Sequence, residues 1–256
     1  MHSTSPFLRR RLAYVTLSLC AAASAPLAAQ TVSYAQGTFN AADWDQVAPT
    51  QTGAFSLSLG VGGGGNFWFI TQSAPAGNTT GTVQSVLINR LFTYNPATNG
   101  ALSVINFSFD LMGVSTVNFG GGGFGFFRPV IRQGGVIFSV SGTNSLPTFG
   151  VNSTRTFAHR ATDNWIARTV GDLRLPDFSA TGGVIDFGWR FDGGGTCPTG
   201  NCTAPSTTTN LDNFSVEVVP TVQSTVPEPS TYALMAFGLI GLLAVARRRG
   251  GASSDA

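Results

Sequence analysis

Apolar and polar residues alternate along several short stretches of the chain, with the period of two that places successive side chains on opposite faces of a β-strand. Residues 105–111 put Ile, Phe, Phe and Leu on one face and Asn, Ser and Asp on the other, and 185–191 and 214–218 repeat the pattern. Between the two ends of the chain no helical period is sustained, so the pattern predicts an all-β, antiparallel sandwich or barrel. Further strands are expected at 53–59, 66–71, 83–94, 124–131, 135–141 and 165–170, separated by clusters of Gly, Asn, Pro and Ser.

The N-terminus has a different pattern. Three arginines at 9–11 precede an apolar stretch at 12–23, and small residues follow as far as Ala29. This order is typical of a cleavable secretory signal, so we expect residues 1–29 to be a helical signal peptide and the chain to pass through the Sec export machinery. The apolar stretch is shorter than the ~20 residues of a spanning helix.

The C-terminus contains three parts in a fixed order. Pro227-Glu228-Pro229 comes first, then an apolar run at 231–246 without any charged residue, and then Arg247, Arg248 and Arg249. The run predicts a short transmembrane helix, whose flanking arginines can extend towards the bilayer surface. Because cytoplasmic flanks carry the positive charge, the arginines and the tail 250–256 are expected in the cytoplasm and the domain outside.

This tail resembles the PEP-CTERM sorting signal of Gram-negative bacteria. The resemblance implies processing by an exosortase, a membrane protease-transferase that recognises the Pro-Glu-Pro motif. It also implies an inner-membrane intermediate, followed by a place at the cell surface or in the extracellular matrix, where such proteins are typically linked with exopolysaccharide and biofilm. The alternative is a plain C-terminal anchor that is never cut.

Between the two ends, residues 30–219 are expected to form one domain, with 220–226 as a linker to the sorting signal 227–249. The formal net charge of the chain is +2, and all 14 basic residues are arginines, but six of these lie in the two terminal clusters. Residues 30–226 hold eight arginines and ten acids, a net charge of −2. A nucleic-acid partner is therefore not expected, because such a partner requires a basic domain.

The end of the body, with alternating residues at 183–191 and the segment Leu211-Asp212-Asn213-Phe214, resembles jelly-roll carbohydrate-binding modules. The resemblance implies a jelly-roll-like β-sandwich with a structural calcium ion near its last strand. Asp212 is then the candidate ligand, with Asp43 or Asp45 as a weaker partner. No other cofactor is expected.

The body contains two cysteines, Cys197 and Cys202, separated by Pro-Thr-Gly-Asn. This spacing suits a tight loop closed by a disulfide, which the oxidising environment of an exported protein favours. Two free thiols are the alternative. A zinc site is disfavoured, because the body offers only His159 as a further nitrogen ligand.

Four tryptophans offer apolar faces on which a sugar ring can stack, although burial is the default for so large a side chain. Trp189 alternates with core residues and is expected to be buried, whereas Trp165 has polar neighbours. Trp165 and then Trp68 are the candidates for sugar stacking.

Candidate catalytic groups are few. A glycosidase needs two facing carboxylates, but the body holds nine Asp and one Glu; Asp43 and Asp45 suit a turn, and Asp186 and Asp192 are expected on a solvent face. His159 has no nucleophile elbow near it. We expect an exported, non-catalytic surface or matrix protein. A carbohydrate-binding module is the first alternative, and a secreted glycan hydrolase is a weaker one.

Overall fold

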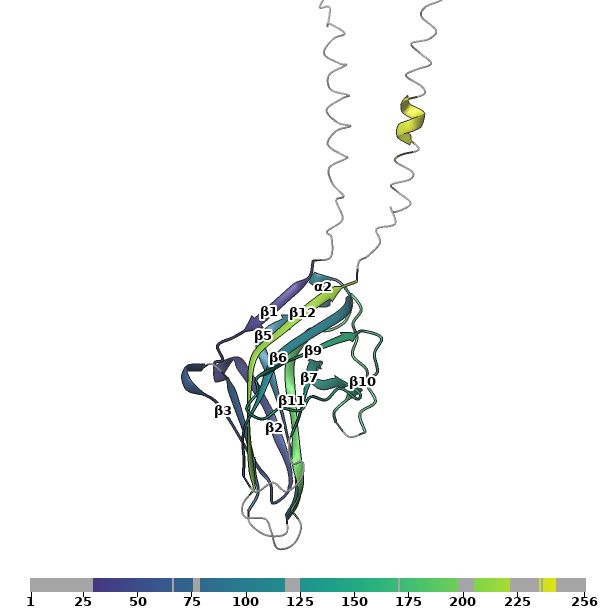
Figure 1. The fold of residues 1–256 in the computed structure, drawn as a ribbon. Coiled ribbons are helices and arrows are strands. Elements are labelled where there is room, and N and C mark those ends of the chain that lie inside the picture. Colours follow the sequence, from purple (N-terminus) through teal and green to yellow (C-terminus); the bar gives the residue numbers. More distant parts are fainter. Residues whose placement is uncertain are drawn as a thin grey trace, which may run out of the picture. The chain divides into compact units, whose positions relative to one another are not determined.

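The alternating stretches pair into two antiparallel sheets of six strands each, which face one another in the body of the protein (Figure 1). The computed structural model describes residues 30–65, 67–75, 79–117, 125–169, 171–197, 205–221, 235 and 237–242. The sheets lie in a unit that spans Ala29–Thr221.

Sheet A has the order β3-β4-β12-β6-β9, and β1 also pairs with β12. The long β12 uses one edge twice: its first residues pair with β4, and Phe214 to Val218 pair with β1. The strands are β1 (Val32–Gln36), β3 (Ser56–Val61), β4 (Trp68–Ser73), β6 (Leu102–Val117), β9 (Ser153–Arg160) and β12 (Ser206–Pro220).

Sheet B has the order β10-β8-β7-β11-β5-β2. Short helical turns η1 (Ala41–Asp43), η2 (Gly63–Gly65) and α2 (Pro96–Asn99) lie in the connections. The strands are β2 (Trp44–Gly53), β5 (Thr79–Tyr94), β7 (Phe126–Gln133), β8 (Val136–Val140), β10 (Trp165–Ala167) and β11 (Ile185–Cys197).

The core between the sheets is largely aromatic. Phe187 of sheet B lies 6.1 Å, centroid to centroid, from Phe107 of sheet A, and Trp44 lies 5.5 Å from Phe214 in an edge-to-face contact. A buried side chain of this size contributes about 1.5–3 kcal/mol by leaving water. As expected, Trp189 is fully buried. The alternation along β6, β11 and β12 thus builds the core.

The all-β class and the antiparallel pairing are confirmed, and each expected strand overlaps an observed one. Three strands escaped the sequence pattern: β1, β2 and β9. β2 contains Pro49, and β9 carries small or polar residues on both faces, so neither alternates clearly. Their place in the sheets is fixed by pairing with β5 and β6.

Outside the sandwich, the structure describes residues 235 and 237–242, which are helical. No helix among the described residues is long and apolar enough to cross a membrane. The expected signal helix 1–29 and most of the expected transmembrane helix 231–246 lie outside the described residues. Both therefore stay predictions.

Candidate functional site

The outer face of sheet B gathers charged side chains. Because Phe187, Trp189 and Phe191 of β11 point into the core, Asp186, Gly188, Arg190 and Asp192 alternate on the other side. The register with β7 sets Arg132 opposite Asp186 and Arg128 opposite Arg190.

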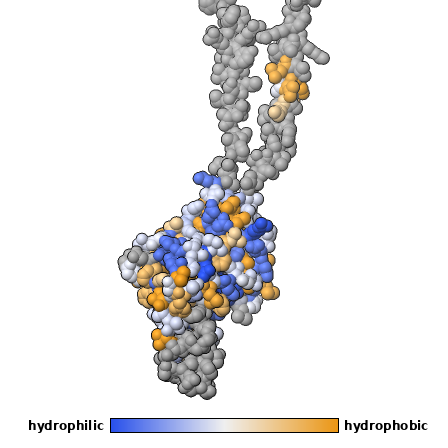
Figure 2. Space-filling model, in the orientation of Figure 1, coloured by the Kyte–Doolittle hydropathy of each residue, from blue (hydrophilic) through white to orange (hydrophobic). Residues whose placement is uncertain are grey.

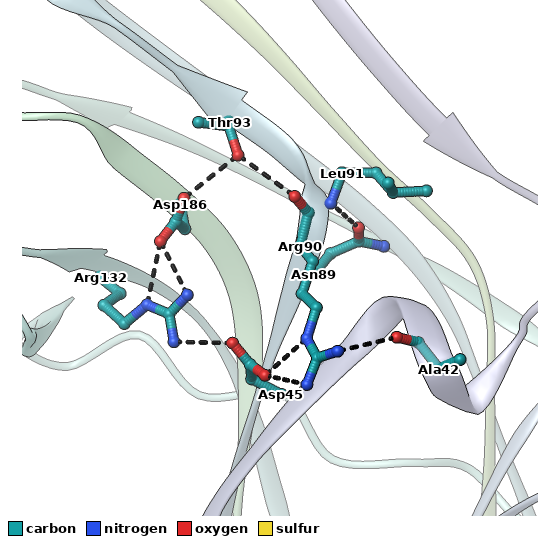
Figure 3. Close-up of polar contacts among 8 residues, drawn as sticks. All are labelled: Ala42, Asp45, Asn89, Arg90, Leu91, Thr93, Arg132 and Asp186. Atoms are coloured by element: carbon teal, nitrogen blue, oxygen red, sulfur yellow. Dashed lines mark hydrogen bonds and ion pairs between the residues drawn. The ribbon is translucent and has the colours of Figure 1, made fainter.

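One group of these charges forms a network, which we call the Arg132 network: Asp45, Arg90, Arg132 and Asp186 (Figure 3). Arg132 donates from Nε to Asp186 Oδ2 at 2.9 Å and from Nη1 to Asp45 Oδ2 at 3.0 Å. Arg90 donates from Nε to Asp45 Oδ1 at 2.6 Å. The hydrogen bond from Arg90, assisted by Arg132, lowers the pKa of Asp45 below its usual value. The network therefore ties β2, β5, β7 and β11 together across the sheet.

A second group, the arginine cluster, consists of Arg128, Arg168, Arg190 and Asp192. Arg190 donates from Nε to Asp192 Oδ1 at 2.7 Å, and Arg128 Nε lies 3.0 Å from Asp192 Oδ2. Arg168, which directly follows β10, donates from Nε to the hydroxyl of Ser139 on β8. Two guanidinium groups thus share one carboxylate, and the third is bonded to a neutral hydroxyl.

The arginine cluster is electrostatically unbalanced. Burial, and then the like charges of Arg128 and Arg190, lower the pKa of Arg168 from its ordinary value to about 10. Burial also lowers the pKa of Arg128. Within the described part of the chain, the buried Nη2 of Arg168 has no hydrogen-bond partner, whereas the buried Nε of Arg128 meets Asp192 as an ion pair at 3.0 Å. A buried donor without an acceptor is costly, and the excess positive charge of the cluster favours a nearby anion.

Arg168 and Arg190 line a groove of about 380 Å³ on this face. Thr50, Gln84 and Thr169 add hydroxyl and amide groups, while Val47, Val86 and Ile137 add apolar surface. The groove thus combines charged, polar and apolar groups, the kinds of group that line small-molecule sites.

The tryptophans predicted to stack on sugars lie in the core. Trp165 is 3% exposed and Trp68 is 6% exposed. Trp165 donates from Nε1 to the carbonyl of Arg160 and packs on Phe178, and Trp68 meets Trp44 edge to face at 6.1 Å. The expectation of exposed stacking faces is therefore wrong, because the chain neighbours of these residues, polar in the case of Trp165, do not reveal that both strands turn the rings inward.

The calcium candidates lie in two separate hydrogen-bonded settings. Asp212 stands opposite Asp110 on β6, and Asn213, in a left-handed conformation with φ of 50°, donates to Asp110 Oδ2 at 2.7 Å. Asp43 accepts from Gln36. Among the described residues no group of three or more His, Cys, Asp or Glu could hold a metal ion. Since calcium takes 6–8 oxygen ligands, two carboxylates form at most part of a site, and calcium at Asp212 stays a prediction.

Other predicted residues fall outside the described part of the chain. These include Cys202, the Pro227-Glu228-Pro229 motif and Arg247 to Arg249, and the side chain of Cys197 is likewise not described. The disulfide therefore remains a prediction.

The charged site itself was missed at the level of the sequence. Alternation around Phe127 and Trp189 already indicates that Arg128 and Arg190 face outward. It does not indicate that β7 and β11 are neighbours, or that Arg168 joins them.

Two antiparallel sheets around an aromatic core, with a groove on one outer face, define the body as a β-sandwich protein. Residues 225–249 of the chain match the PEP-CTERM protein-sorting motif. This motif implies an exported protein that passes through a membrane-anchored intermediate and is processed by an exosortase.

Solved structures similar to the chain include two carbohydrate-binding modules. The family 11 module of the cellulosomal cellulase Lic26A-Cel5E of Clostridium thermocellum is 14% identical, with a TM-score of 0.32, over 71% of this chain and 89% of that one. The CBM22-1 xylan-binding domain of Paenibacillus barcinonensis Xyn10C is 10% identical, with a TM-score of 0.31, over 77% and 100%. No curated protein matches the chain significantly.

Proposed function

We propose that the protein is a non-catalytic component of the surface or extracellular matrix of a Gram-negative bacterium, which associates with exopolysaccharide after exosortase processing. The observation that carries this proposal is the sorting motif at 225–249, which follows within a few residues of the last strand, β12, ending at Pro220. A folded domain joined so closely to a sorting signal is well placed to be displayed as cargo.

The state of the carboxylates supports a non-catalytic role. Asp45, Asp186 and Asp192 each pair with at least one arginine. A general acid needs a raised pKa so that it carries a proton near neutral pH, whereas the pKa of Asp45 is lowered. These three acids therefore form ion pairs that stabilise neighbouring strands.

The proposal is tested in cells by replacing Pro227-Glu228-Pro229 with alanines. We expect uncut chain to accumulate in the inner membrane, while a matched control that replaces residues 221–223 with alanines is processed normally. In the unmodified background, removal of exopolysaccharide synthesis should move the mature protein from the matrix to the medium. Normal processing of the motif variant, or unchanged matrix retention without polysaccharide, would contradict the proposal.

A carbohydrate-binding module is the second candidate, and the groove beside Arg168 and Arg190 favours it. A direct binding assay with the purified protein and the polysaccharide of the producing cell distinguishes a carbohydrate-binding module from a purely structural component. Binding in the purified system supports the module, whereas retention that requires other matrix proteins supports a purely structural component.

A further inference from the structure

Positive charge is concentrated in the arginine cluster, although the body as a whole carries a net negative charge. The residues between 30 and 221 that the structure does not describe, 66, 76–78, 118–124, 170 and 198–204, include no charged residue. Every charge in this range therefore has a described position. That body carries a net charge of −2. The arginine cluster nevertheless sets three guanidinium groups against the single carboxylate of Asp192, a local charge of +2.

Without a bound anion, the arginines of the cluster repel one another. Arg128 and Arg190 stand directly opposite each other on neighbouring strands, a cross-strand pairing of like charges that destabilises a sheet. Their side chains are only 14% and 10% exposed, so water screens the repulsion weakly. Asp192 offsets part of this repulsion for Arg128 and Arg190, but Arg168 has only the neutral hydroxyl of Ser139. A bound carboxylate would offset one of the two excess positive charges.

The groove indicates what kind of anion fits. Arginine pairs with carboxylates through two parallel N–H···O hydrogen bonds and is the usual residue for this recognition. A small inorganic anion would need only the guanidinium groups. The groove also presents apolar surface from Val86 and Ile137, and hydroxyl or amide groups from Thr50 and Gln84. Apolar, hydroxyl, amide and cationic groups in one lining together match a sugar ring that carries a carboxylate.

We propose that the groove beside Arg168 and Arg190 binds the carboxylated sugar units of an acidic polysaccharide. This proposal rests on the proposed association with exopolysaccharide and names the chemical class of the polymer. Arg168 and Arg190 hold the carboxylate, Thr50 and Gln84 bond ring hydroxyls, and Val86 and Ile137 contact the apolar side of the ring.

The test is affinity electrophoresis of the full chain, purified in detergent, through gels that contain polygalacturonate. The matched ligand is the same polymer after chemical reduction of its carboxyl groups, which keeps its linkages and ring hydroxyls. We expect retardation by polygalacturonate only, reversed by raised salt. Arg168→Gln should weaken binding about tenfold or more, as expected for the loss of a charge-assisted hydrogen bond. Arg174→Gln, which removes the same charge from an exposed side chain paired with Asp172, should bind like the original protein.

Three results would overturn the proposal: equal retardation by the reduced polymer, equal retardation by dextran sulfate, or equal weakening by Arg174→Gln and Arg168→Gln. If Arg168→Gln fails to fold, as judged by circular dichroism, the proposal is still tested with the original protein. Its retardation by polygalacturonate is then compared with that by the reduced polymer, and the salt dependence is measured. Failure of this proposal leaves the matrix role standing if the protein still leaves the matrix when exopolysaccharide synthesis is removed. Failure of the proposed function would show instead as unchanged matrix retention in those cells.

Discussion

Arg190 and Asp192 stand two residues apart on the outer face of β11, and Arg190 Nε donates a 2.7 Å hydrogen bond to Asp192 Oδ1. The same carboxylate also faces Arg128 on β7, 3.0 Å away. Asp192 is therefore the one acid that offsets the charge of the arginine cluster. Figure 2 shows hydrophilic and hydrophobic residues interspersed on the visible face of the body.

Asp192→Asn should lower the free energy of unfolding by about 3 kcal/mol, because it leaves two poorly exposed arginines without their counter-charge. Urea unfolding of the purified protein measures the change. Asp172→Asn, in the pair with the exposed Arg174, is the matched control and should cause little change. A loss of stability no greater than that of the control would show that Asp192 does not balance the cluster.

Arg132 should couple energetically with Asp186, because its guanidinium joins Asp186 to Asp45 across the sheet. These side chains are 21–31% exposed, so we expect a coupling of about 0.5–1 kcal/mol in a double-mutant cycle of Arg132→Met and Asp186→Asn. Thermal or urea unfolding of the four proteins provides the measurement. Strictly additive effects would mean that the ion pair between Arg132 and Asp186 contributes no measurable coupling energy to stability.

Acidification should destabilise the sandwich through His159. This side chain is 6% exposed, and burial lowers its pKa below the ordinary value of 6.5, despite the opposing charge of Asp163. The unfolded chain then binds a proton that the folded chain resists, so stability is present above pH 6.5 and is lost as the pH falls below it, by up to about 1.4 kcal/mol per pH unit.

Urea unfolding between pH 7 and pH 5 tests this expectation, with His159→Gln as the comparison. The variant should have the flatter profile, since the predicted signal segment contains the other histidine of the chain, His2. Identical slopes in both proteins would assign the pH dependence to another group.

Reduction of the predicted Cys197–Cys202 disulfide should lower stability by only about 2 kcal/mol, because so short a loop loses little entropy in the unfolded chain. Cys202→Ser should do the same, and peptide masses under non-reducing conditions should show the link. Free thiols in the exported protein, or a collapse of the sheets on reduction, would each contradict this expectation.

Contiguous stretches of the chain were sufficient for two conclusions. Alternation at 105–111, 185–191 and 214–218 identified strands and their inward faces, because the two-residue period of a strand is a local property. The tail was recognisable because a proline motif, an apolar run and an arginine cluster act in linear order. Neither conclusion depends on which segments meet in space.

The neighbours of each strand were decided only in three dimensions. Arg128, Arg168 and Arg190 are tens of residues apart along the chain. Arg128 and Arg190 share Asp192 because β7 lies beside β11, and Arg168 and Arg190 line one groove. Burial of Trp68 and Trp165 follows from the same packing, which in the case of Trp165 overrides its polar neighbours in the chain. Strand order depends on the summed packing of the whole core and not on any single segment, and for this reason the site emerged only from the assembled sandwich.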